Sequence, residues 1–430
     1  MFQRAESAAL VAVRSKTKQM KNRTVGIIGG GASGLMAAIS AARAGAQVTL
    51  IEHMDRVGKK ILSTGNGRCN LTNYRMEPEC YRCSQKDFPM KVIQGFGVEE
   101  TLEFFKYLGI VPKDRNGYVY PNSDQAASVL DVLRWETERL GIRVLLSCQV
   151  SVIKPQRDGG FLIRSSQGTL HTDTLILAAG SKAAPSTGSD GSGYELAKAL
   201  GHKVIKPLPA LVQLRCQGTL YKQLAGIRTE ARIRLLADGI CMAEDKGELQ
   251  LTDYGLSGIP VFQVSRFAAK ALYNKQEVTA VLNFMPQMSE EEFTVFLAER
   301  ARLRPQKTAE EFLTGLFHKK MIALWVKCSR ISKEKPVGTY SEEELRTLVR
   351  LIQQFEVNVE GTNSFEQAQV CCGGVSTEEV KEDTLESSYV PGVYFAGEIL
   401  DVDGICGGYN LQWAWSSGWI AGREAADVTN

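Results

Sequence analysis

The residues best suited to chemistry begin with a glycine-rich hexapeptide, Gly29-Gly30-Gly31-Ala32-Ser33-Gly34, which has the spacing G-x-G-x-x-G. It follows an apolar run, Val25–Ile28, and precedes an alanine-rich run, so the pattern predicts a strand, a tight turn and a helix. Gly29 permits the turn, Gly31 lets the backbone approach a pyrophosphate, and Gly34 permits close helix packing. The first N–H groups of the helix attract the anion. The motif predicts a dinucleotide site, and a purely structural turn is the alternative.

An acidic residue stands where such a site requires one. Glu52 ends the next predicted strand, Gln47–Glu52, and its carboxylate would accept hydrogen bonds from a ribose diol. This residue type also favours a free 2′-hydroxyl over a 2′-phosphate. His53 follows directly, and we expect its backbone to contact the adenosine ribose.

A second candidate segment, residues 57–73, contains glycines, cations and amides but no carboxylate. Backbone and side-chain donors at this density suit phosphates and a polar ring, although a solvated loop is the alternative. We therefore expect an anionic or flavin-like ligand. The candidate contacts in this segment are Lys59, Lys60, Gly65, Asn66, Arg68, Cys69 and Asn70.

The elements that would position these residues follow from hydrophobic periodicity. Further strands are predicted at residues 143–152, 161–164, 174–178 and 392–396. Helices are predicted at residues 35–44, 98–108, 126–140 and 410–426. Strands that alternate with helices predict an α/β fold with a Rossmann-like domain.

The domain organisation is predicted to be discontinuous. A basic tail covers residues 1–23, and the first part of the dinucleotide domain covers 24–205. Residues 206–362 lack any Rossmann-type glycine turn and are predicted to form an inserted lobe, β-rich at 208–286 and helical at 287–355. Residues 363–430 return to a strand, a glycine-rich turn and an aromatic helix, which predicts the second part of the domain.

Composition excludes several classes of protein. The 430 residues are 44% hydrophobic and 23% charged, which excludes wholesale disorder and a multi-span membrane protein. The net charge of +3 supplies no long phosphate-binding surface, so no nucleic-acid partner is expected. The ten cysteines indicate reduced thiols in a cytoplasmic chain. Cys80 and Cys83 form a lone C-x-x-C pair, which does not complete a metal site, and no metal is expected.

Three segments together resemble a known family. Gly58–Asn73, GKKILSTGNGRCNLTN, is similar to a signature of the bacterial flavoproteins that include aminoacetone oxidase and the 3-dehydro-bile acid Δ4,6-reductase. Gly188–His202 and Gly397–Gly418 extend the resemblance across nearly all of the chain after about residue 24. The bile acid reductase is the favoured member. The resemblance implies an FAD-binding domain of the glutathione-reductase and fumarate-reductase type.

The resemblance also implies further FAD contacts. Val150 would bind adenine through its backbone, and the turn before the last helix would face the pyrimidine end of the isoalloxazine. Asp403 sits beside this turn, where tethering the turn is an equally good role. The implied contacts are Gly29, Gly31, Ala32, Ser33, Gly34, Glu52, His53, Val150, Ala179, Gly180, Gly397, Glu398, Asp403, Gly407, Gly408, Asn410 and Leu411.

These observations predict an FAD-dependent oxidoreductase that passes a hydride to a conjugated C=C bond. The resemblance implies a small-molecule substrate such as a 3-oxo steroid or bile acid. The sequence has no second unit of a strand, a G-x-G-x-x-G turn and a helix. NADH or NADPH is therefore expected to bind only transiently as the electron donor. Tyr254 is a candidate proton donor, because it stands where relatives commonly have histidine.

Two other functions remain open. The first is an aminoacetone or amine oxidase that releases peroxide. The second is a flavin-binding protein that associates with RNA or senses redox state. Only the weakly positive net charge of the chain and its basic tail support this function.

Overall fold

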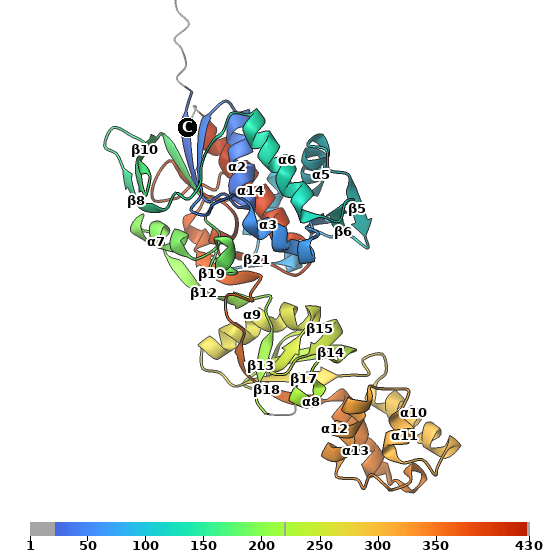
Figure 1. Ribbon diagram of the computed structural model, residues 1–430. Helices are drawn as coiled ribbons and strands as arrows, with labels where there is room; N and C mark the ends of the chain where they lie inside the picture. Colours follow the sequence, from blue (N-terminus) through green and yellow to red (C-terminus); the bar gives the residue numbers. More distant parts are fainter. Residues whose placement is uncertain (1–21, 219–220, 428–430) are drawn as a thin grey trace, which may run out of the picture.

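The computed structural model describes residues 22–218 and 221–427, which form a sheet-containing domain and an inserted lobe (Figure 1). The domain is built on a parallel sheet with strand order β20–β11–β1–β2–β7. Its strands are β1 (Thr24–Ile28), β2 (Gln47–Ile51), β7 (Arg143–Leu145), β11 (Thr174–Leu177) and β20 (Val393–Phe395). Strands β11 and β20 are buried along their whole length, as expected where both faces of a parallel sheet are covered. The structure confirms the predicted Rossmann-like α/β architecture.

Two helices from opposite parts of the sequence, α2 (Ala32–Arg43) and α14 (Tyr409–Ala426), pack against each other beside this sheet (Figure 1). Gly418 and Gly422 of α14 lie against the carbonyl oxygens of Ser33 and Ala37, where a Cβ atom would collide. These glycines therefore allow the last segment to complete the domain that the first segment begins. The other helices of the domain are α3 (Lys59–Ser63), α4 (Phe88–Gly95), α5 (Val98–Tyr107), α6 (Ala126–Arg139) and α7 (Ser192–Ala199).

Small sheets and 3₁₀ turns surround the parallel sheet. One antiparallel sheet contains β8 (Val150–Pro155), β9 (Phe161–Ser165) and β10 (Gly168–Thr172). Another contains β3 (Thr72–Asn73), β5 (Pro112–Arg115) and β6 (Tyr118–Pro121), and β4 (Tyr81–Cys83) pairs with β21 (Val402–Gly404). The 3₁₀ turns of this domain are Thr64–Gly67, Pro78–Cys80, Pro185–Thr187, Thr377–Glu379 and Gly397–Ile399.

A two-stranded ladder connects the domain to the inserted lobe. Strand β12 (Val204–Ala210) leads out of the domain, and β19 (Val370–Val375) returns to it, with the two strands antiparallel. The lobe has its own hydrophobic core, separate from the core around the parallel sheet. The two bodies are thus joined mainly by this ladder and by one helix of the lobe, α9 (Ile259–Tyr273), which packs on β12.

The first part of the lobe is a closed barrel with strand order β13–β16–β15–β14–β17–β18. Its strands are β13 (Leu214–Cys216), β14 (Arg228–Ala237), β15 (Ile240–Leu251), β16 (Gly255–Ser257), β17 (Val278–Asn283) and β18 (Phe355–Thr362). A short helix, α8 (Tyr221–Leu224), and α9 accompany the barrel. Strand β18 closes the barrel by pairing with both β17 and β13.

A helical unit is inserted between β17 and β18 and lies at the far end of the lobe from the parallel sheet (Figure 1). Serine or threonine side chains cap three of its helices at Ser289, Thr308 and Ser341, each in a reciprocal pair with a glutamate. The helices are α10 (Glu290–Leu303), α11 (Ala309–Leu313), α12 (Lys319–Ser329) and α13 (Glu342–Gln353), with a 3₁₀ turn at Val337–Thr339.

The described residues contain neither a candidate membrane-spanning helix nor a candidate metal cluster. Of the helices in residues 22–218 and 221–427, none is long and apolar enough to cross a membrane. Within the same residues, no cluster of three or more His, Cys, Asp or Glu could hold a metal ion. The predicted basic tail falls almost entirely outside the described residues.

Candidate active site

The main candidate site is a cavity of ≈ 660 Å³ at the carboxyl ends of β1, β2 and β11, where Ile28, Ile51 and Ala178 line it. Open α/β sheets bind ligands at this edge. Segments far apart in the sequence meet here. The sequence-predicted residues that line the cavity are Gly29, Gly31, Ala32, Ser33, Glu52, His53, Lys59, Lys60, Gly65, Asn66, Arg68, Asn70, Val150, Ala179, Gly180, Glu398, Gly407, Gly408, Asn410 and Leu411.

The three motif glycines of the turn have different roles. Gly29 has φ 104°, in the region that favours glycine, and its N–H donates to Ile51 O at 2.8 Å. Gly31 has an ordinary φ of −77°, but nothing lies within 4 Å of a Cβ built there, so its backbone is open to the cavity. Gly34 instead packs against the Gly29 carbonyl and does not line the cavity. The turn thus presents the start of α2 to an anion.

Glu52 lies directly against this turn, and hydrogen bonds orient its side chain. Its Oε2 accepts from Gly30 N at 2.7 Å, and its Oε1 accepts from Met54 N at 2.8 Å. The residue is only 7% exposed, and that exposure is toward the cavity it lines. Each carboxylate oxygen keeps a second lone pair, so the group can still accept hydrogen bonds from a diol.

Lys60 and Glu398 form a network inside the cavity. Lys60 Nζ lies 2.7 Å from Glu398 Oε2 and also donates to Ala183 O at 3.1 Å. Glu398 Oε1 accepts from Ser181 Oγ at 2.7 Å and from Cys371 N at 3.1 Å. Glu398 therefore fixes the Lys60 cation at the cavity wall and links α3 to the returning strand β19.

The turn before α14 forms the other end of the cavity. Gly407 and Gly408 have φ 130° and 94°, and Asn73 Nδ2 donates to Gly407 O at 3.0 Å. Asn410 fixes the same turn, because its side chain donates to Gly404 O at 2.9 Å and accepts from Gly404 N at 2.8 Å. The start of α14 thereby faces the cavity with free N–H groups, which stabilise negative charge.

Besides Gly34, four predicted residues lie outside the cavity lining. Cys69 is fully buried, and burial raises its pKa to about 12. Gly397 packs against the side chain of Ser33. Asp403 is occupied by an ion pair, and Tyr254 lies in the lobe with its phenol oxygen accepting from Asn363 Nδ2 at 3.0 Å. The structure therefore does not bring Tyr254 to the candidate site.

Asp403 joins the domain to the inserted lobe. Its Oδ1 accepts from Arg266 Nη2 at 2.8 Å, and its Oδ2 lies 2.8 Å from Arg266 Nε. The side chains are 3% and 12% exposed, and Arg266 belongs to α9. One turn away, Gln263 Oε1 accepts from Cys406 N at 3.0 Å. Helix α9 thus holds the turn that precedes α14 at two points.

The Asp403 carboxyl is expected to give a measurable pH dependence. Burial raises its pKa from 3.8 to about 6, although Arg266 opposes the shift. The folded protein therefore binds this proton more tightly than the unfolded chain, so the free energy of unfolding contributed by Asp403 falls as pH rises from about 4 to about 6. Burial lowers the pKa of His202, which gives a slope of the opposite sign.

Urea unfolding of the wild type and of Asp403→Asn between pH 4 and pH 7 isolates this contribution, because the His202 slope is common to both proteins. We expect the difference between the two free energies to change across this range and to level off above it. A difference that does not vary with pH would contradict the raised pKa.

Several lining residues carry no motif in the sequence. Tyr118 and Tyr120 come from β6, and Ile259 and Phe262 come from the first turn of α9. Leu211 and the segment 366–370, which come from either side of the connecting ladder, also line the cavity. The alternation of Tyr118 and Tyr120 is the one signal that places the pair on a single face of a strand.

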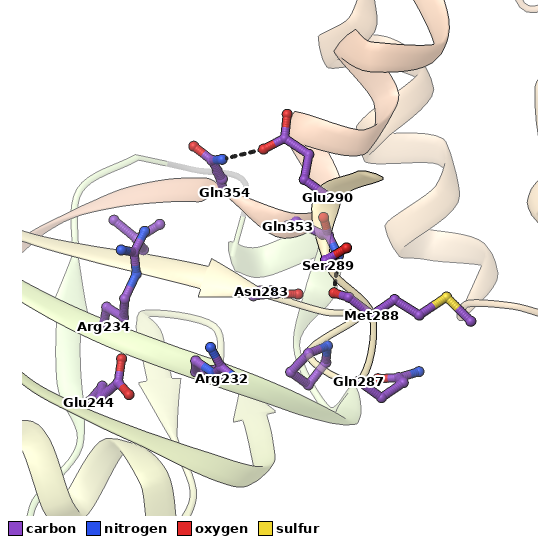
Figure 2. Close-up of a pocket in the computed structure, with 12 residues that line it drawn as sticks. Arg232, Arg234, Glu244, Asn283, Gln287, Met288, Ser289, Glu290, Gln353 and Gln354 are labelled. Atoms are coloured by element: carbon purple, nitrogen blue, oxygen red, sulfur yellow. Dashed lines mark hydrogen bonds between the residues drawn. The ribbon is translucent and has the colours of Figure 1, made fainter. Parts of the chain in front are cut away.

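A second cavity, of ≈ 430 Å³, lies in the lobe between the barrel and the helical unit (Figure 2). It is lined by polar side chains, including Arg232 and Arg234 of β14. Several of its amides are already bonded within the lobe: Gln354 Nε2 donates to Glu290 Oε2 at 2.8 Å, and Gln353 Nε2 donates to Met288 O at 2.9 Å. It shares no lining residue with the larger cavity, which remains the candidate active site.

Known proteins resemble this chain along nearly its whole length. It is 47% identical to the 3-dehydro-bile acid delta(4,6)-reductase of Clostridium scindens over 405 residues, which cover 94% of this chain and 99% of the relative. It is 29% identical to the ribosomal RNA dihydrouridine synthase of Haemophilus influenzae over 399 residues, 91% of this chain and 96% of the relative. The predicted resemblance to the family of the bile acid reductase is confirmed.

Among solved structures, the fold resembles that of 3-ketosteroid-Δ4-(5α)-dehydrogenase from Rhodococcus jostii RHA1 in complex with 4-androstene-3,17-dione, with a TM-score of 0.46, 15% identity and coverage of 96% of this chain and 99% of that one. The sequence model of the HI0933-like protein Rossmann domain matches residues 23–424. That match includes the parallel sheet, the larger cavity and the inserted lobe. The chain therefore belongs to the HI0933-like family of Rossmann-domain proteins.

Proposed function

We propose that this protein is an FAD-dependent oxidoreductase that reduces a conjugated C=C bond of a 3-oxo steroid or bile acid. The observation that carries the proposal is the 47% identity, over 94% of the chain, to a protein named 3-dehydro-bile acid delta(4,6)-reductase. The cavity supports it with a dinucleotide-type turn at one end and the start of α14 at the other.

The residues of the cavity fit FAD. Glu52 and the backbone of Val150 would hold the adenosine, and the open backbone at Gly31 would accept the pyrophosphate at the start of α2. Gly407 and Gly408 would face the pyrimidine end of the ring system, where the start of α14 stabilises negative charge. When bound and reduced, FAD supplies a hydride to an electron-poor carbon.

The side of the cavity that the lobe covers suits a flat apolar substrate. Leu211, Ile259, Phe262 and Val370 line it there, and Ile405 faces it from the turn before α14. Ile259 is 59% exposed, so an apolar group is available to a ligand at this wall. Binding a steroid here would remove this apolar surface from water, which stabilises the complex by about 25 cal/mol per Å² of apolar surface buried.

The proposal includes a nicotinamide nucleotide as a transient electron donor and a cytoplasmic location. The ten cysteines are all described and all unpaired, as is usual for a protein of a reducing compartment. A nicotinamide nucleotide that binds and then leaves needs no binding domain of its own, because the reduced FAD keeps the two electrons that the nucleotide delivers.

The test is a half-reaction that is followed by visible absorbance. The purified protein, reduced with NADH or NADPH in the absence of oxygen, is expected to be reoxidised when a 3-oxo-4,6-diene bile acid is added. A saturated 3-oxo bile acid is the matched control and should leave the protein reduced. If neither steroid reoxidises the protein, and aminoacetone yields peroxide in air, the reductase proposal is wrong and the protein is an amine oxidase.

A second candidate is the reduction of uridine in ribosomal RNA, which the 29% identity to the Haemophilus influenzae synthase favours. The C5=C6 bond of uracil is conjugated with a carbonyl, so the same hydride chemistry applies. Incubating the reduced protein with a ribosomal RNA transcript and measuring dihydrouridine by mass spectrometry distinguishes the two substrates. RNA reduction without steroid reduction would overturn the first candidate.

A further inference from the structure

Strand β6 carries two phenols on the face that lines the candidate active site. Tyr118 and Tyr120 are two residues apart, so they point to the same side of the strand, and both line the larger cavity. Val119 between them points the other way and is fully buried. The strand is therefore anchored in the domain on one face and presents phenols to the cavity on the other.

Tyr118 lies directly against the turn that precedes α14. A Cβ atom built on Gly407 would be 2.8 Å from Tyr118 Cε1, so the ring and the turn are in contact. Asn73 pairs with Tyr118 in the β3–β6 ladder and donates to Gly407 O at 3.0 Å, which fixes this juxtaposition from the backbone side. Tyr118 thus stands at the end of the cavity assigned to the redox-active ring.

The Tyr118 hydroxyl is available to a ligand. The residue is 40% exposed, and its hydroxyl has no hydrogen-bond partner among residues 22–218 and 221–427. A phenol O–H can both donate a hydrogen bond and give up its proton. This combination suits a group that meets a substrate oxygen or carbanion rather than one that stabilises the fold.

The other proton donors at this end are less well placed. Tyr120 lies beneath the Arg115 guanidinium, 5.4 Å from the ring centre, and burial raises its pKa. Cys406 is partly buried, and desolvation raises the pKa of its thiol to about 12. Arg68 lines the cavity but keeps its proton at all ordinary pH values.

On the basis of the proposed function, we propose that Tyr118 is the catalytic proton donor in the reduction of the conjugated C=C bond. The hydride, with its two electrons, comes from FAD that a nicotinamide nucleotide has reduced, and it forms a C–H bond at the electron-poor carbon. The π bond breaks, and the resulting enolate takes the proton of Tyr118 Oη to form the second C–H bond. The phenolate then recovers a proton from water.

The test compares Tyr118→Phe with Tyr120→Phe, Cys406→Ala and Tyr273→Phe. Tyr273 is 57% exposed at the end of α9 and serves as the matched control, because it does not line the cavity. All four variants are checked first for FAD content and thermal stability. We expect Tyr118→Phe to be reduced by NADH or NADPH at the wild-type rate but to be reoxidised by the dienone at least about 100-fold more slowly.

A binding measurement provides a readout other than activity. A steroid with a phenolic A ring mimics the enolate, and its binding to the oxidised protein is followed by the change in the flavin spectrum. Tyr118→Phe should weaken this binding about tenfold or more, whereas it should leave binding of the corresponding steroid without the hydroxyl unchanged. Loss of both ligands equally would indicate a packing role and overturn the proposal.

The outcomes separate this inference from the proposed function. Reoxidation of Tyr118→Phe at the wild-type rate overturns the role of Tyr118 while the reductase stands. A large loss of the reoxidation rate that occurs only in Tyr120→Phe or Cys406→Ala assigns the proton-donor role to that residue. This result likewise overturns the role of Tyr118. A wild-type protein that no dienone reoxidises refutes the proposed function and the proton-donor role with it.

Discussion

Gly31→Val is expected to give a folded protein that no longer retains FAD. Nothing lies within 4 Å of a Cβ at Gly31, and its φ of −77° suits any residue, so the protein itself can accept the larger side chain. The isopropyl group would instead fill the space through which a pyrophosphate reaches the start of α2. We expect FAD affinity to fall at least about 100-fold, which corresponds to about 2.8 kcal/mol.

The measurements for this prediction separate folding from binding. Far-ultraviolet circular dichroism should match the wild type, whereas the visible absorbance of the purified variant should be lost. Valine at a helix N-cap costs about 1 kcal/mol, so a small loss in thermal stability is expected even without FAD. Gly361→Ala is the matched control, since Gly361 lies in β18 of the barrel with only Arg215 Cδ near, at 3.9 Å from the added Cβ. Full FAD content in Gly31→Val would show that the pyrophosphate does not bind at this turn.

Arg266→Met is expected to cause the largest loss of stability among single changes at the junction of the two bodies. It leaves the Asp403 carboxyl, 3% exposed, without the guanidinium that pairs with it and donates a hydrogen bond from Nη2. Removing one member of a buried pair costs about 3–5 kcal/mol, because the remaining charge stays desolvated. Arg82 pairs with Asp403 across the β4–β21 ladder and is close enough to interact with its charge, which favours the lower end of this range.

Urea unfolding of three variants tests this prediction. Combining Arg266→Met with Asp403→Leu should recover most of the lost free energy, because two well-packed apolar groups replace the pair without a buried charge. Arg346→Met, which breaks an exposed pair with Glu342 on α13, should change stability little. Equal losses in the single and double variants would mean that packing, and not the buried charge, sets the effect.

The parts of the site that the sequence predicted are those that depend on neighbours along the chain. The glycine turn and Glu52 belong to one β–α–β unit, so their spacing alone places them side by side at the cavity. The Rossmann-like architecture follows from the same local patterns. The resemblance then added the contacts from residues 397–411, which no spacing rule connects to residue 31.

The parts that the sequence could not predict depend on contacts between distant segments. Barrel closure requires β18 to pair with β17 across the whole helical unit, so the pattern of 208–286 could not show a closed barrel. Arg266 and Asp403 are 137 positions apart, and neither belongs to a motif that names the other. The position of Asp403 beside the turn predicts a cofactor contact, but its carboxylate pairs with Arg266 of α9 instead.

The catalytic candidate shows the same limit. Tyr254 stands where the resemblance implies a histidine in a family loop, and sequence position cannot show that this loop lies outside the cavity lining. Tyr118 sits in a strand of only four residues, where no periodic pattern is long enough to mark a functional face. Only the contact with Gly407 places it at the redox end of the cavity.

The packing of α14 on α2 sets an order of events during protein synthesis. The barrel and helical unit lie within residues 214–362 and have a hydrophobic core of their own, so this lobe can fold while translation continues. The cofactor domain cannot, because β20 and α14 are made after the lobe and complete its sheet and its site. We therefore expect the domain to acquire FAD only after the α14 segment has emerged from the ribosome, when every residue of the lobe has already been made.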